Sequence, residues 1–360
     1  MKTFQDLKLA APLEKALAAM NFTVPTPIQA EAIPVAMENR DLIGCAQTGT
    51  GKTAAFAIPM ISRLLRMPAK TALILAPTRE LAVQIAEVIE NLTAFAPELK
   101  HVVLIGGNAM QPQIRSLQKK PRIVIATPGR LVDHLKRGTL SLSAAEVLVL
   151  DEADRMLDMG FAPQLNEIYR FVPRSRQTML FSATLPSDIL KLAGKWLKDP
   201  VRVTIGAVSQ PAKKVSNEAI QTTSQKKNDL LLDELNARQG SVLIFARTKH
   251  RTDRVARYLS EYGHPVTRIH GNRSQAQRNA AINGFRSGEF RVMVATDIAA
   301  RGLDISHIAH VINYDLPQVA EDYIHRIGRT GRAGASGEAV CFVTPEDRMQ
   351  WRAISRLLTN

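Results

Sequence analysis

Short apolar runs alternate along the chain with longer segments in which apolar residues return every three or four positions. A continuous apolar run of four or five residues is typical of a strand buried on both faces, and the longer spacing predicts amphipathic helices. Helical spacing is clearest at Leu13, Leu17 and Met20 and again along 81–89. The predicted strands are 41–44, 72–76, 102–105, 123–126, 147–150, 178–181, 242–245, 266–269, 291–295 and 309–313.

One polar segment interrupts this alternation. Residues 206–217 contain a glycine, a proline, two serines and two lysines, and they show no periodicity. Such a composition predicts an interdomain linker. The predicted fold class is therefore α/β, with two tandem parallel-sheet lobes at 1–205 and 218–360. Ligands bind beyond the carboxyl ends of parallel strands, and the reactive residues of this chain follow those ends.

The first strand is followed by a phosphate-loop pattern, A-Q-T-G-T-G-K-T at 46–53, in which Ala46 replaces the usual glycine. Its glycines let backbone N–H groups converge on phosphate oxygens at a helix start. Lys52 is expected between the outer phosphates of ATP, and Thr53 at a magnesium ion. Pro59 predicts a kink or an end in the following helix. The expected nucleotide contacts are Ala46, Gln47, Thr48, Gly49, Thr50, Gly51, Lys52 and Thr53.

An acidic run, D-E-A-D at 151–154, follows the strand at 147–150. Asp151 is placed to hold Mg²⁺, and Glu152 is placed to polarise the water that attacks the γ-phosphate. The alternative is an acidic helix start stabilised by the helix dipole. The phosphate loop upstream favours the metal site.

Two later motifs complete the chemistry. Ser182-Ala183-Thr184 ends a predicted strand, and H-R-I-G-R-T-G-R occupies 325–332. Arg329 and Arg332 would face the same way on a helical turn, and guanidinium groups stabilise the charge of a transferring phosphoryl group. A single arginine often pairs with a surface acid instead, but that does not explain the whole run. The predicted catalytic residues are Lys52, Asp151, Glu152, Arg329 and Arg332.

Together these motifs resemble those of DEAD-box RNA helicases of superfamily two, over essentially the whole chain. The resemblance implies two RecA-like lobes. F-T-V-P-T-P-I-Q at 22–29 resembles the Q motif, which implies that Phe22 stacks on adenine and that Gln29 reads its edge. Asn21 stands where glycine is usual, and Asp304 is implied to reach the ribose. The runs R-T-K-H and H-G-N-R-S-Q are most similar to the bacterial RhlE group.

Further strand ends carry groups suited to RNA phosphates rather than bases. The expected contacts in the first lobe are Arg79, Gly107, Thr127 and Arg130. The resemblance implies a similar role in the second lobe for Arg247, Gly271, Gln275, Arg278 and Thr296. Each arginine has the alternative of a surface or interlobe ion pair. Aromatic residues make up 5% of the chain and do not line these loops, so base stacking and sequence-specific reading are not expected.

Composition and charge agree with this interpretation. The net charge is +14, and the parts before and after residue 208 contribute +7 each, which fits a polyanion that lies across both lobes. Cys45 and Cys341 lie far apart in apolar segments and are expected to be buried in a reducing compartment. The N-terminal residues lack the apolar core of a signal peptide, and no run of 18 apolar residues occurs. The chain is therefore expected to be a cytoplasmic monomer without a membrane span, and its protein partners stay open.

The expected function is ATP-dependent RNA unwinding. ATP and RNA would each favour a closed form because each touches both lobes, so their binding would be cooperative. Closure would bend one strand and separate a short duplex, and hydrolysis would release the RNA. Ser182 and Thr184, with Asp154 as partner, would link the phosphate state to the lobe contact. The alternatives are a DNA-directed translocating helicase, since these residues alone do not separate RNA from DNA, and an ATP-gated RNA clamp without hydrolysis.

Overall fold

The structure is a computed structural model that describes residues 1–47, 49–205, 215–300, 308–331 and 337–359. The chain divides into two compact units, residues 1–208 (unit 1) and 209–360 (unit 2). The division falls inside the predicted linker, of which 206–214 lie outside the described residues. The last part of that segment, 215–217, belongs to a strand, β8 (Val215–Gln221), which pairs in parallel with β13 (Gly337–Val343). Pairing with the buried strand β13 thus keeps this polar segment in a strand conformation that its own sequence does not predict.

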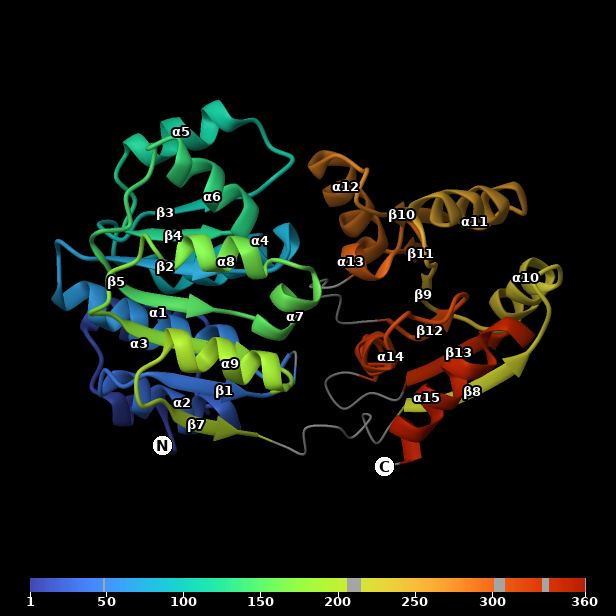
Figure 1. Ribbon diagram of the computed structural model, residues 1–360, viewed down its shortest axis with the longest axis horizontal. Coiled ribbons are helices and arrows are strands. Elements are labelled where there is room, and N and C mark those ends of the chain that lie inside the picture. The colour runs from blue at the N-terminus through green and yellow to red at the C-terminus, as the bar shows by residue number, and fades with distance from the viewer. Residues whose placement is uncertain (48, 206–214, 301–307, 332–336, 360) are drawn as a thin grey trace. The chain divides into compact units, whose positions relative to one another are not determined.

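Unit 1 is built on a seven-stranded parallel sheet in the order β3-β4-β2-β5-β6-β1-β7, most of whose strands are labelled in Figure 1. Its central strands are buried on both faces because their apolar runs are continuous. The strands are β1 (Leu42–Cys45), β2 (Thr71–Leu75), β3 (His101–Leu104), β4 (Ile123–Ala126), β5 (Ala145–Leu150), β6 (Gln177–Ser182) and β7 (Val201–Thr204).

Alternate side chains of these strands enter two cores, one on each face of the sheet. Leu42 and Ile74 pack with the first four α-helices, whereas Ile43 and Leu73 pack with the later ones. The helical elements on the first face are η1 (Phe4–Leu7), α1 (Ala11–Ala19), α2 (Pro27–Met37), α3 (Lys52–Arg66) and α4 (Arg79–Leu92). Those on the second face are α5 (Met110–Gln118), α6 (Pro128–Lys136), α7 (Ala153–Asp158), α8 (Ala162–Ile168) and α9 (Ser187–Trp196).

Helix α3 does not end at Pro59, because it runs through this residue to Arg66, and the alternative of a kink stays a prediction. Proline removes one helical hydrogen bond. Phe56, Ile58 and Ile61 around it are fully buried. Packing on both sides therefore keeps the segment helical against the local preference of proline.

Unit 2 has a six-stranded parallel sheet in the order β10-β11-β9-β12-β13-β8. Numbered from the first strand of each unit, this order is 3-4-2-5-6-1, which is also the order in unit 1 before the added edge strand β7. The strands not yet given are β9 (Val242–Phe245), β10 (Val266–Ile269), β11 (Val292–Ala295) and β12 (His310–Asn313). The predicted α/β fold with two tandem parallel-sheet lobes is thus confirmed.

The helices of unit 2 also cover both faces of its sheet. Leu231 of α10 and Val255 of α11 lie in one core, and Phe285 of α12 and Ile354 of α15 lie in the other. The helical elements are α10 (Lys227–Ala237), α11 (Lys249–Glu261), α12 (Gln275–Ser287), α13 (Asp297–Ala300), α14 (Ala320–Ile327), η2 (Pro345–Asp347) and α15 (Arg348–Thr359).

Cys45 and Cys341 are both free and buried, as the apolar sequence around each predicts. Burial raises the pKa of the Cys45 thiol and raises that of Cys341 to about 11. In the described part of the chain, no helix is both long and apolar enough to cross a membrane.

Candidate nucleotide site and RNA track

The phosphate loop lies between β1 and α3, at the carboxyl end of a central strand. Gly49 and Gly51 have φ angles of 84° and 91°, in the left-handed region that favours glycine. Lys52 is the first residue of α3, and its Nζ donates to the carbonyl oxygen of Ala46 at 2.6 Å. The Thr50 hydroxyl donates to the carbonyl of Gln47 at 2.7 Å, and the predicted contact Thr48 lies outside the described residues. The lysine is therefore folded back over the loop, with a neutral acceptor holding its ammonium group.

Gln29 connects the predicted adenine-binding segment to this loop. Its Oε1 accepts from the backbone N–H of Thr26 at 2.9 Å, which forms a capping box at the start of α2. Its Nε2 donates to the carbonyl of Gly51 at 3.1 Å. A Cβ at residue 51 would lie 2.4 Å from that nitrogen, so a larger residue would displace the Gln29 amide, and the positive φ favours glycine independently. Phe22 is partly buried against Phe4, with ring centroids 5.7 Å apart.

The acidic pair follows β5, which lies two strands from β1 with β6 between them. Asp151 is buried, and its Oδ1 accepts from the backbone N–H of Glu152 at 3.0 Å. Burial raises the pKa of Asp151 to about 7; Lys52 opposes the shift, and the neighbouring carboxylates of Glu152 and Asp154 add to it. The neighbouring carboxylates oppose ionisation of the buried Asp151, so a cation bound beside Asp151 would stabilise its ionised form.

Glu152 begins helix α7 with φ 50° and ψ 53°, in the left-handed region. A non-glycine residue in this region costs about 1–2 kcal/mol, so the surrounding structure must hold it there. Its Oε2 accepts from Nη1 of Arg155 at 2.6 Å, and both side chains are buried. Arg155 is not among the site residues predicted from the sequence, although a spacing of three residues at a helix start is a recognisable signal for an ion pair.

Asp154 joins the acidic run to the segment after β6. Its Oδ2 accepts from the backbone N–H of Ala183 at 3.0 Å, and from the N–H and hydroxyl of Thr184 at 3.0 and 3.1 Å. The hydroxyl of Ser182 donates to the carbonyl of Thr184 at 2.6 Å. The residues expected to couple phosphate state to lobe contact are thus hydrogen-bonded together, whereas the coupling itself stays a prediction.

The four RNA candidates of unit 1 follow the adjacent strands β2, β3 and β4. The guanidinium of Arg79 lies over the Gly106–Gly107 backbone, and a Cβ at Gly107 would clash with it at 2.0 Å. Arg130 donates from Nη1 to the carbonyl of Asn108 at 3.0 Å. Thr127 begins helix α6 and is largely buried. A side chain at residue 107 would therefore displace the Arg79 guanidinium, and the φ of 81° there favours glycine.

The corresponding candidates of unit 2 follow β9, β10 and β11. Arg278 is buried and donates from Nη1 to the carbonyl of His270 at 3.2 Å. Gln275 donates to Oδ1 of Asn279 at 3.0 Å, and the backbone N–H of Thr296 donates to the carbonyl of Ile269 at 3.3 Å. Space is open beside Gly271, where an added Cβ would meet nothing within 4 Å.

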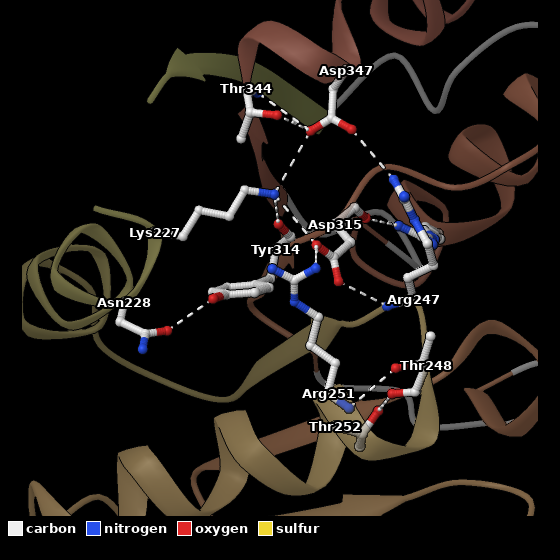
Figure 2. Close-up of polar contacts among 11 residues, drawn as sticks. Lys227, Asn228, Arg247, Thr248, Arg251, Thr252, Tyr314, Asp315, Thr344 and Asp347 are labelled. Carbon is white, nitrogen blue, oxygen red and sulfur yellow. Dashed lines mark hydrogen bonds and ion pairs between the residues drawn. The ribbon is translucent and has the colours of Figure 1, made fainter. Parts of the chain in front are cut away.

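Arg247, the remaining RNA candidate, is part of a cluster of charges for which the sequence carries no local signal. Figure 2 shows the Lys227 ammonium between the carboxylates of Asp315 and Asp347, with Nζ–O distances of 3.3 and 3.7 Å. Arg247 lies 3.3 Å from the other oxygen of Asp347, and Arg251 lies 3.4 Å from Asp315. Lys227 and Asp315 are almost fully buried, while the two arginines are about two-fifths exposed. Five charges from distant parts of unit 2 therefore meet at the ends of β9, β12 and β13.

The expectation of a helical turn at Arg329 is wrong, because α14 ends at Ile327 and Gly328 caps it. Arg329 lies in the turn that follows, where its side chain is buried and Nε donates to the carbonyl of His325 at 3.3 Å. Arg326, three residues earlier, forms a two-point ion pair instead: its Nε and Nη2 donate to the two carboxylate oxygens of Asp297 at 2.5 and 2.7 Å. Arg332 and the predicted ribose contact Asp304 lie outside the described residues.

A phosphate loop that opens a helix, an acidic residue beyond a nearby parallel strand and a second unit of the same topology define a nucleotide-hydrolysing protein of the tandem RecA-like class. Comparison with known proteins gives the family. Residues 26–192 match the DEAD/DEAH box helicase family, and residues 226–334 match the helicase conserved C-terminal domain.

Relatives cover nearly the whole chain. The DEAD-box ATP-dependent RNA helicase CshA of Geobacillus kaustophilus is 44% identical over 99% of this chain and 76% of its own length. The ATP-dependent rRNA helicase rrp3 of Aspergillus terreus is 46% identical over 99% of this chain and 80% of its own. The structure of S. cerevisiae Dbp5 bound to RNA and ADP BeF3 matches with a TM-score of 0.88, at 33% identity, over 99% of this chain and 94% of that one.

This chain therefore belongs to the DEAD-box family of ATP-dependent RNA helicases, and it is an ATP-hydrolysing enzyme of that family. The resemblance stated from the motifs is confirmed at the level of the family. The relatives named above do not include the RhlE group, so the assignment to that group stays a prediction.

Proposed function

We propose that unit 1 binds ATP with Mg²⁺ through the loop 46–53 and hydrolyses it with Glu152 as the residue that polarises the attacking water. The observation that carries this proposal is the placement of Lys52 after β1 and of Asp151 and Asp154 after β5, where Lys52 opposes the upward pKa shift of Asp151. The Lys52 ammonium would exchange its loop carbonyl for phosphate oxygens. Gln29, already bound to Gly51, would face the adenine edge and favour ATP over GTP.

The chemistry of the donors fits magnesium. Mg²⁺ prefers oxygen ligands and is usually held by one or two protein groups together with substrate phosphates. The Thr53 hydroxyl and the Asp151 carboxylate supply such oxygens, and the crowded carboxylates beside Asp151 would be relieved by a divalent cation. When bound, the ion supplies positive charge to the β- and γ-phosphates.

We propose that the residues that follow strands two, three and four of each unit bind RNA through the phosphates of its backbone. Arg79 and Arg130 in unit 1, and Arg247 and Arg278 in unit 2, supply guanidinium groups for phosphates. Hydrolysis would also require Arg329 and Arg332, which belong to unit 2 in the sequence. This division of the catalytic residues would make ATP and RNA binding cooperative and would allow local duplex unwinding.

Two free, buried cysteines fit a reducing compartment, and we propose that the chain works in the cytoplasm as a monomer. The decisive experiment measures ATP hydrolysis by the whole chain with single-stranded RNA, with single-stranded DNA of the same sequence and with neither. Stimulation by RNA of at least tenfold over DNA supports the proposal. Equal stimulation by both would favour the DNA-directed helicase, and tight ATP-dependent RNA binding without turnover would favour the clamp.

A further inference from the structure

The carboxylate of Glu152 is held at one oxygen. Oε2 accepts from Arg155 Nη1 at 2.6 Å, and the two side chains are 5% and 4% exposed. Among the described residues, no hydrogen bond to the other oxygen, Oε1, is formed. A buried carboxylate is costly unless it is paired, so Arg155 satisfies the charge while it leaves one oxygen for another donor.

The backbone enforces this geometry. Glu152 has φ 50° and ψ 53°, and its N–H donates to Asp151 Oδ1 at 3.0 Å. The carbonyl of Glu152 accepts from the N–H of Met156 at 3.1 Å, which anchors the start of α7. Strained backbone at the centre of a catalytic motif points to a function for the orientation that it imposes. Here the strain directs the Glu152 side chain over the first turn of α7, where Arg155 meets it.

We propose that Arg155 is a positioning residue that fixes Oε2 of Glu152 so that Oε1 accepts a proton from the attacking water. This inference rests on the proposed role of Glu152 in hydrolysis. In the step, the water oxygen forms a bond to the γ-phosphorus, its proton passes to Oε1, and the bond from the γ-phosphorus to the bridging oxygen breaks with its electron pair leaving on ADP. Arg155 itself touches neither ATP nor the water.

A purely structural role for Arg155 makes different predictions. If the ion pair only stabilises unit 1, its loss should reduce thermal stability and leave the rate constant of the folded enzyme unchanged. If Arg155 positions the base, its loss should reduce kcat and leave KM for ATP unchanged, because the substrate contacts remain. The effect should also vanish when Glu152 is no longer a carboxylate, because the two residues act through one interaction.

The test compares Arg155→Met, Arg155→Lys, Glu152→Gln and the double variant Arg155→Met/Glu152→Gln in the whole chain. Arg63→Met is the matched control, since Arg63 forms a partly buried ion pair with Glu146 elsewhere in unit 1. RNA-stimulated ATP hydrolysis gives kcat and KM, thermal unfolding reports folding, and RNA binding with a non-hydrolysable ATP analogue reports the earlier steps. Arg155→Met should lower kcat by about tenfold or more, as a fraction of the ~10²–10⁴ that a general base contributes. Arg155→Lys should retain more activity than Arg155→Met.

In the Glu152→Gln background, Arg155→Met should change kcat by less than about twofold. The inference is overturned if Arg155→Met lowers kcat equally in both backgrounds, if it raises KM instead, or if Arg63→Met lowers kcat as much. Failure of the proposed function looks different: Glu152→Gln alone would then keep the turnover of the unmodified chain, whatever the Arg155 variants do.

Discussion

Two lysines occupy the same place in the two units, and their surroundings differ completely. Lys52 is the first residue of the helix after the first strand of unit 1, and Lys227 is the first residue of the helix after the first strand of unit 2. Lys52 is held by one neutral carbonyl, at 2.6 Å. Lys227 donates to the carbonyl of Tyr314 at 2.7 Å and lies within ion-pair distance of Asp315 and Asp347. The first ammonium group can exchange its partner for a phosphate, whereas the second is already neutralised.

The segments that precede these lysines explain why the same topology gives two outcomes. Residues 46–51 contain two glycines with positive φ, so their backbone N–H groups can turn toward an anion. Residues 222–226 read T-T-S-Q-K and contain no glycine. Asp315, which follows β12, corresponds in position to Asp151, which follows β5. Unit 2 thus has a lysine and an acid, Lys227 and Asp315, at the positions of Lys52 and Asp151, but these two residues form an ion pair with each other.

The residues that follow strands two, three and four are similar in the two units, in contrast to the surroundings of the two lysines. Thr78 and Thr248 each begin the helix after strand two, and each accepts from an N–H three residues on at 3.2 Å. Thr127 and Thr296 both follow strand four. The candidates therefore follow strands two, three and four in both units, whereas a glycine-containing phosphate loop occurs at this position only in unit 1 among the described residues. On the proposed assignment, both units would contact RNA, unit 1 would hold the ATP phosphates, and unit 2 would add the arginines of hydrolysis.

The most severe test of this division removes the arginines that unit 2 would contribute to hydrolysis. Arg329→Ala, and likewise Arg332→Ala, should lower RNA-stimulated ATP turnover by ~10³–10⁵, the range for a finger arginine. ATP affinity without RNA should stay nearly unchanged, because unit 1 holds the expected nucleotide contacts. Nucleotide titration without RNA, followed by turnover at increasing RNA concentration, measures both. Should residues 1–208 alone hydrolyse ATP with RNA as fast as the whole chain, the division of labour would be refuted.

A smaller loss is expected within unit 1 itself. Glu152→Gln should lower ATP turnover by ~10²–10⁴, because the amide no longer accepts the proton of the attacking water. ATP-dependent RNA binding should persist, since Lys52, Asp151 and the arginines remain. Turnover is measured by phosphate release, and binding by fluorescence anisotropy of labelled RNA. A rate within threefold of the unmodified chain would show that Glu152 is not the base.

The two lysines can be compared directly by making the same change at both. Lys52→Met should weaken ATP binding by about 10- to 100-fold, because a charge-assisted hydrogen bond to phosphate contributes about 1.5–3 kcal/mol. Lys227→Met should leave ATP binding unchanged and should lower the free energy of unfolding of unit 2 by about 1–3 kcal/mol, because the carbonyl of Tyr314 and the buried Asp315 lose a donor while each aspartate keeps an arginine partner.

Isothermal titration with ATP and thermal unfolding separate these effects. Each variant is the control for the other, since both remove one buried lysine at a helix start. The comparison would collapse if Lys227→Met weakened ATP binding as much as Lys52→Met, because the cluster of unit 2 would then take part in nucleotide binding.

Much of this organisation could be predicted from the sequence because it depends on local patterns. Continuous apolar runs predicted buried strands to the residue at 123–126 and 242–245, and the mixed segment 266–269 also matches its half-buried strand. The phosphate loop and the acidic run are each a continuous stretch of sequence, so their chemistry can be predicted without knowledge of the fold. Gly328 is a typical helix-ending residue, and it predicts the end of α14 better than the spacing of Arg329 and Arg332 predicts a further helical turn.

What escaped prediction depends on contacts across the fold. Strand β8 is polar and exists because β13 pairs with it. The cluster around Lys227 joins residues up to 120 positions apart, a pairing that distance along the chain does not reveal. The pair of Arg155 and Glu152 has a local signal in its spacing of three residues, but the burial and left-handed backbone of Glu152 are not visible in the sequence.

The smallest predicted effect concerns the base that unit 1 selects. Gln29 donates to Gly51 and accepts from Thr26, so its amide is fixed in orientation at the edge of the phosphate loop. Gln29→Ala should weaken ATP binding by about tenfold, as expected for one or two lost hydrogen bonds, and should remove most of the preference for ATP over GTP. Gln113→Ala is the matched control, because Gln113 is also buried in unit 1 and donates to a backbone carbonyl, that of Ile105, at 3.1 Å. Competition binding with ATP and GTP measures the preference. If the unmodified chain hydrolysed GTP and ATP equally with RNA present, Gln29 would serve only to brace the loop, and unit 1 would recognise phosphates without reading the base.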